Sequence, residues 1–137
     1  MTADSTSSSQ PRRPATRTRR PGIARLLRVV LWLLTVSVFA QPVFAGLFLE
    51  RHNAWRDWHA TNGMLVLPLL ALIQVVLAVL AWRAGRWPGW LPLASAGLLL
   101  AIIIQNVLGM NGQLALHVPL GVAIFGLVAT LLGRTRA

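Results

Sequence analysis

The sequence predicts an all-α membrane protein, an up-down bundle of four transmembrane helices made of two αα-hairpins. Three observations support this fold class. Hydrophobic residues make up 55% of the 137 residues, four long apolar runs divide the chain, and the arginines gather in the N-terminal segment or near the ends of those runs. A water-soluble domain of this size needs more charge to cover its surface.

The four apolar runs have the length of transmembrane helices. They cover roughly residues 26–49, 60–81, 90–109 and 114–132. Each has about 19 to 24 residues, and a helix crosses the hydrocarbon core of a bilayer with about 20. The runs lack the alternation of apolar and polar residues that a membrane barrel needs, so helices are expected. Because the connections between the runs are short, neighbouring helices should be antiparallel.

The basic residues predict the orientation of the chain. Residues 1–24 are rich in Ser, Thr, Pro and Arg, which predicts a disordered basic tail before a transmembrane domain of residues 25–137. Eleven of the thirteen arginines lie in or next to this tail, in the turn of residues 83–86, and at the C-terminus. The positive-inside rule then places both termini in the cytoplasm, in a multi-pass protein of the cell (inner) membrane. This distribution favours contact with anionic lipid and argues against a nucleic-acid partner.

A cleaved signal peptide is the competing interpretation of the first run. Val43–Ala45 before Gly46 has the small-residue pattern of a cleavage site. However, the run from Leu26 to Leu49 is longer than the usual apolar region of about 7–15 residues, so we expect the first helix to be retained.

The two predicted hairpins carry a similar pattern of polar residues. Gln41 lies near the outer end of the first helix and His59 near the outer start of the second. Gln105 and His117 occupy the same places in the second hairpin. Residues i and i+4 share one face of a helix. The residues that follow these four at that spacing are all small: Ala45, Gly63, Gly109 and Gly121.

His59 and His117 are the candidate ligands of a haem iron. In an up-down bundle the second and fourth helices lie diagonally across the core, so the two imidazoles should face each other near the outer leaflet. Two axial imidazoles are the ligand set of many b-type haems, and Gly63 and Gly121 would leave room for the flat macrocycle. The absence of cysteine excludes disulfides and thiolate metal sites.

Other polar residues fit the same cofactor. Gln41 and Gln105 are expected to fix the tautomer of each histidine or to reach a haem propionate. Arg51 and Arg56 are the cations on the outer side that would meet propionates. A different interpretation stays open, namely a structural or accessory membrane subunit without a cofactor, because Gln and Gly also serve in membrane bundles as interhelical hydrogen-bond formers and close-packing residues.

Two stretches of the chain carry a family resemblance. IIIQNVLGMNGQLALHVPLGVAI (102–124) and, more loosely, WHATNGMLVL (58–67) resemble one four-helix unit of the haem A synthase family. The resemblance covers about residues 25–133 and implies that His59 and His117 are haem ligands. The chain has one unit where that family has two and lacks its loop cysteines, so the synthase chemistry is not implied. The chain is also similar to small uncharacterised actinobacterial four-helix integral membrane proteins.

The sequence therefore predicts an integral membrane protein that binds one haem b for electron transfer or haem handling. Membrane lipids and a respiratory or haem-handling membrane complex are the expected partners. No catalytic residue is assigned, because no acid–base pair is visible in the sequence. Transport is a weaker hypothesis, since the runs lack the interior charges and broken helices typical of transporters.

Overall fold

The computed structural model describes residues 22–50, 54–85 and 87–135. These residues form four helical segments, each long and apolar enough to cross a membrane, and they contain no strand. The helices are α1 (Gly22–Leu49), α2 (Ala54–Thr61), a π-helical turn (Asn62–Val66), α3 (Leu67–Arg83), α4 (Trp90–Met110) and α5 (Leu114–Arg134). The second segment runs from α2 through the π turn to α3. The predicted all-α four-helix membrane bundle is confirmed.

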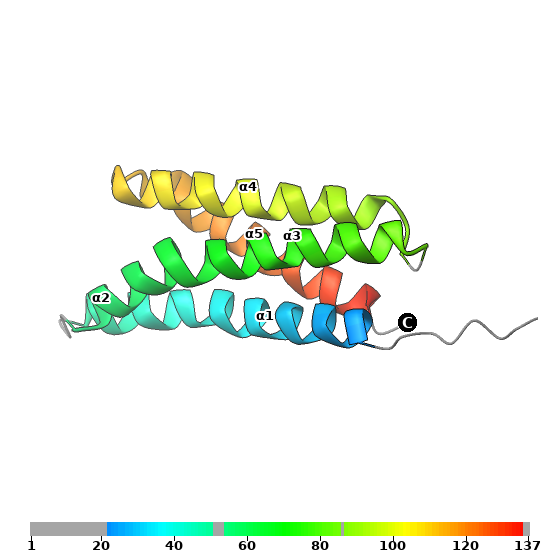
Figure 1. The fold of residues 1–137 in the computed structure, drawn as a ribbon. Coiled ribbons are helices and arrows are strands. Elements are labelled where there is room, and N and C mark those ends of the chain that lie inside the picture. Colours follow the sequence, from blue (N-terminus) through cyan, green and yellow to red (C-terminus); the bar gives the residue numbers. More distant parts are fainter. Residues whose placement is uncertain (1–21, 51–53, 86, 136–137) are drawn as a thin grey trace, which may run out of the picture.

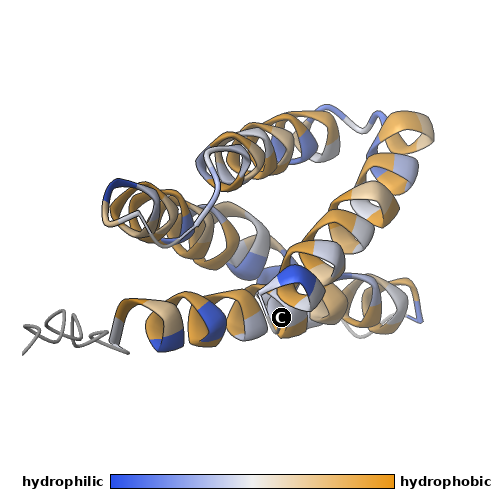
Figure 2. Cartoon of the chain, turned by 90° about the vertical axis from the view of Figure 1, so that its right-hand side faces the viewer, coloured by the Kyte–Doolittle hydropathy of each residue, from blue (hydrophilic) through white to orange (hydrophobic). Residues whose placement is uncertain are grey.

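The four segments run alternately in opposite directions (Figure 1). α1 and α4 each pack against both α3 and α5. The second and fourth segments therefore lie diagonally across the bundle, as predicted. We call the end with the α1–α2 and α4–α5 connections the histidine end, and the opposite end the terminal end. α5 starts beside α4 at the histidine end and crosses the bundle to finish beside α1 at the terminal end (Figures 1 and 2).

The second segment begins earlier than the apolar run indicates. Its first helix starts at Ala54, whereas the run predicts a start near residue 60. The opening turns carry exposed polar residues such as Arg56 and Asp57, so hydropathy does not reveal them. His59 consequently lies well inside the helical segment instead of at its start.

The first segment also begins earlier than predicted. Residues 22–24, expected in the tail, belong to α1. The expected disorder of the tail otherwise concerns residues 1–21, which lie outside the described residues.

The buried core is concentrated at the terminal end. Its largest fully buried apolar side chains come from α1, α4 and α5: Leu27, Leu31, Leu34, Leu91, Leu98, Ile102, Val128 and Leu131. In α1 and α4 no hydrophobic residue beyond Val38 and Ile102 is buried, and in α5 none before Ile124. Many large apolar side chains outside this core are exposed, as expected for surfaces that contact lipid. The bundle is thus tightly packed at one end and open at the other.

The π turn places a main-chain carbonyl where another helix can reach it. A proline ring clashes with the carbonyl four residues before it, and Pro68 also lacks an N–H. The N–H of Leu67 is donated to Asn62 O, five residues before it, whereas in an α-helix it would be donated to Gly63 O. The carbonyl of Gly63 instead accepts a hydrogen bond of 2.8 Å from Asn106 Nδ2 of α4. This bond ties the second segment to α4 beside the candidate site.

Candidate functional site

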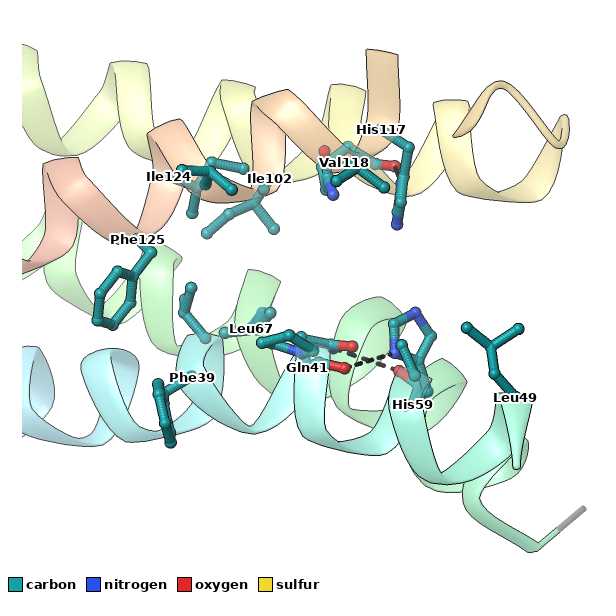
Figure 3. A pocket seen from close by; sticks show the side chains of 17 residues that line it. Phe39, Gln41, Leu49, His59, Leu67, Ile102, His117, Val118, Ile124 and Phe125 are labelled. Carbon is teal, nitrogen blue, oxygen red and sulfur yellow. Dashed lines mark hydrogen bonds between the residues drawn. The ribbon is translucent and has the colours of Figure 1, made fainter. Parts of the chain in front are cut away.

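His59 and His117 come together at the histidine end. Their ring centroids are 6.4 Å apart, and the ring planes are inclined by 56°. The two side chains project toward each other from diagonal segments, across the space between α1 and α5 (Figure 3). Both residues are half-buried. The predicted encounter of the two imidazoles across the bundle is present in the structure.

Each histidine is oriented by a main-chain carbonyl of the preceding helix. His59 Nδ1 lies 3.1 Å from Gln41 O, and His117 Nδ1 lies 2.9 Å from Gln105 O. A carbonyl oxygen can only accept a hydrogen bond, so Nδ1 must carry the proton in both rings. In the neutral imidazole Nε2 then keeps its lone pair, which is the form that binds a metal.

The glutamine side chains lie against the second and fourth segments. Gln41 Nε2 donates to His59 O at 3.3 Å. A Cβ added to Gly63 would lie 3.1 Å from Gln41 Nε2, and one added to Gly121 would lie 3.0 Å from Gln105 Nε2. These glycines therefore admit the glutamine of the neighbouring helix, where the sequence had suggested room for a macrocycle. The main-chain carbonyl of each glutamine, and not its side chain, accepts the hydrogen bond from the histidine ring.

The same arrangement occurs in both hairpins. In each, a glutamine carbonyl holds a histidine, and the glycine four residues after that histidine packs on the glutamine side chain. The residue four positions after each glutamine differs. It is Ala45 in the first hairpin and Gly109 in the second. A Cβ at Gly109 would lie 2.8 Å from His117 Cε1, so the His117 ring rests directly on the α4 backbone.

A cavity of about 500 Å³ lies between α1 and α5 and contains both histidines in its wall. This volume falls in the range of small-molecule sites. Apart from the two histidines and two glutamines, its lining consists of apolar residues, proline and glycine. Phe39 and Phe125, with ring centroids 6.0 Å apart, lie at the end of the cavity away from the histidines (Figure 3).

Several lining residues have no signal in the sequence. Gly46, Phe39 and Phe125 line the cavity because α5 crosses the bundle at an angle, and a single sequence does not specify that angle. Gly121 lines it as predicted, whereas Gly63 does not. Only one of the two glycines that were predicted to lie beside the haem therefore lines the cavity.

Of the two predicted propionate partners, only Arg56 belongs to the part of the chain that the structure describes. Arg56 is exposed on α2 and does not line the cavity, and Arg51 lies outside the described residues. In the part of the chain that the structure describes, no three residues of the types His, Cys, Asp and Glu gather as they would around a metal ion. Metal chemistry at this site would therefore depend on the histidine pair.

Comparisons of the chain with protein-family models, with curated proteins and with solved structures found no match. The functional interpretation consequently depends on the geometry of the histidine pair and of the cavity around it.

Proposed function

We propose that the protein binds one b-type haem between His59 and His117. The spacing of the two rings is the observation that carries this proposal. Metal–imidazole bonds are about 2 Å long, so two nitrogens on opposite sides of one metal are about 4 Å apart and the ring centres about 6 Å apart. The centroid distance here is 6.4 Å. The rings thus stand close to the separation at which both could hold one metal ion.

The surroundings of the histidines support the same ligand. Metal-bound histidines generally donate their second ring N–H to a carboxylate, carbonyl or water, and both histidines here donate Nδ1–H to a carbonyl. The mostly apolar wall of the cavity suits the face of a porphyrin. Small residues in the wall, Ala45 and Gly121, limit the bulk next to the histidines.

A bound haem would supply one-electron redox chemistry or would itself be the cargo. The side chains of this chain hold and orient the group, and the apolar cavity keeps water from its faces. We place the protein in the cell membrane with both termini in the cytoplasm, because four of the five arginines that the structure describes lie at the terminal end of the bundle: Arg25, Arg28, Arg83 and Arg134.

One observation favours the cofactor-free alternative. Each Nδ1–carbonyl hydrogen bond joins the two helices of one hairpin, so each histidine also stabilises the packing of these helices. In that case the protein would be a structural or accessory subunit, and removing a histidine would change stability without changing any spectrum.

A spectrum distinguishes the two functions. The protein is purified in detergent with haem supplied, and a reduced-minus-oxidised difference spectrum is recorded. We expect a low-spin haem signal that is lost in His59→Ala and in His117→Ala. His52→Ala, which removes the third histidine of the chain, is the matched control and should keep the signal. A colourless wild-type preparation would eliminate the haem proposal.

A further inference from the structure

We propose that haem reaches and leaves this site sideways, from within the bilayer, through an opening between α1 and α5. This inference depends on the proposed haem site and deepens it, because it makes a membrane-dissolved porphyrin the exchangeable ligand. It favours haem handling over the permanent retention of an electron-transfer cofactor.

The wall of the cavity continues onto the outer surface of the bundle. On α1 the lining residues Pro42, Gly46 and Leu49 follow each other along one face, and on α5 Val118, Val122 and Phe125 do the same. All six are exposed. Leu49 is 78% exposed and Val122 is 69% exposed. We call these two rows the lips of the cavity.

The crossing of α5 explains why the lips stand apart. At the terminal end α1 and α5 are joined, since Arg28 Nε donates to Thr135 O at 2.7 Å. The Phe39–Phe125 contact lies further along the same pair of helices. Beyond it α5 leans toward α4, and the space between α1 and α5 widens toward the histidines (Figure 3). The lips therefore stand on two helices that diverge toward the histidine end.

The chemistry of the lips matches the bilayer. All six lip residues are aliphatic, aromatic, proline or glycine, so the opening offers no side-chain partner to water. It faces the lipid because its lip residues are exposed on the sides of two transmembrane helices. The macrocycle of haem is largely apolar and partitions into a bilayer, while its two charged propionates stay at the headgroups. Haem can pass through an opening of this kind without crossing a polar surface.

Gly46 offers a way to close the opening without disturbing the packing. A Cβ at Gly46 would meet no atom within 4 Å, so a larger side chain fits there and projects at the lip. Val122→Trp narrows the opening from the opposite lip. Two control substitutions introduce the same side chains at exposed positions of α4 that do not line the cavity, namely Gly97→Leu and Leu93→Trp.

The test measures the rate of haem uptake. Apoprotein in lipid vesicles is mixed with donor vesicles preloaded with haem, and the low-spin spectrum is followed in time. We expect Gly46→Leu and Val122→Trp to slow uptake about tenfold, the effect of a barrier raised by about 1.4 kcal/mol, with an unchanged final spectrum. Gly97→Leu and Leu93→Trp should match the wild type.

The outcomes separate this inference from the haem site itself. Uptake at the wild-type rate in both lip variants, with a normal spectrum, would refute sideways access and leave the haem site standing. A final spectrum altered in the lip variants but not in the controls would also count against it, because the lips would then shape the bound state. Failure of the wild type to form the spectrum, even in detergent with haem, would remove both proposals.

Discussion

At the scale of single residues, the His117 ring lies so near Gly109 that this position has no room for a side chain. An alanine Cβ at position 109 would lie 2.8 Å from Cε1 and 3.0 Å from Nδ1 of that ring. The ring is rigid and its Nδ1 is held by Gln105 O, so it would have to tilt. The hydrogen bond to Gln105 O and the close approach of Gly109 together fix the orientation of the His117 ring, and with it the direction of Nε2.

Gly109→Ala should therefore weaken haem binding while the bundle stays folded. Changes beside a metal-ligating histidine typically reduce affinity about ten- to hundredfold. The measurement is a haem titration of the purified protein, with helix content followed by circular dichroism. Gly97→Ala, on the same helix with nothing within 4 Å of its Cβ, is the control. Equal affinities for the two variants would show that the ring is free to move.

Asn106 is a second residue whose removal has a defined cost. Its Nδ2 donates to Gly63 O at 2.8 Å. In Asn106→Ala this carbonyl loses its partner inside the membrane, which should destabilise the fold by about 1–2 kcal/mol. Unfolding in mixed detergents measures the change. Asn111→Ala, which removes an exposed bond to Val107 O of its own helix, should cost clearly less.

At the scale of helices, the π turn makes the Asn106 bond necessary. In Pro68→Ala, residue 68 gains an N–H and loses the ring that clashes with the preceding turn. Gly63 O can then be satisfied from within its own helix. We expect Asn106→Ala to cost less in the Pro68→Ala background than in the wild type. A double-mutant cycle measures this coupling, and strictly additive free energies of unfolding would contradict the explanation.

The helices themselves were largely predictable from the sequence, because apolar length decides which segments enter a membrane. The start of the second segment at Ala54 was not, since its first turns carry polar residues. The Gln–His repeat also predicted which side chains meet. It did not predict that backbone carbonyls hold the rings, because the register between two helices depends on side-chain packing along their whole length.

The cavity shows a further limit of prediction at this scale. Phe39 and Phe125 read as ordinary apolar residues of two transmembrane helices. Their contact depends on the crossing of α5, which tertiary packing sets. The polar side chains of the candidate site, His59 and His117, left a signal in the sequence. Phe39 and Phe125, which contribute only to the shape of the cavity, left none.

At the scale of the whole molecule, the two ends have different properties. The terminal end has the buried leucine core, and cationic side chains strengthen it. Arg28 donates to Thr135 O just past the end of α5, where a cation also interacts favourably with the helix dipole. Arg134 lies 5.3 Å from the centroid of the Trp90 ring. Because this end is fixed, the histidine end can stay open without loss of the fold.

The orientation of the bundle decides which side of the membrane the site faces. The chain contains no cysteine, so single cysteines can report on accessibility without background. With both termini in the cytoplasm, Asp57→Cys at the histidine end should react with a membrane-impermeant maleimide in intact cells. Ala84→Cys in the α3–α4 turn should react only after permeabilisation. Both residues are exposed. The reverse labelling pattern would put the histidine pair on the cytoplasmic side, and the haem would then be exchanged with the inner leaflet.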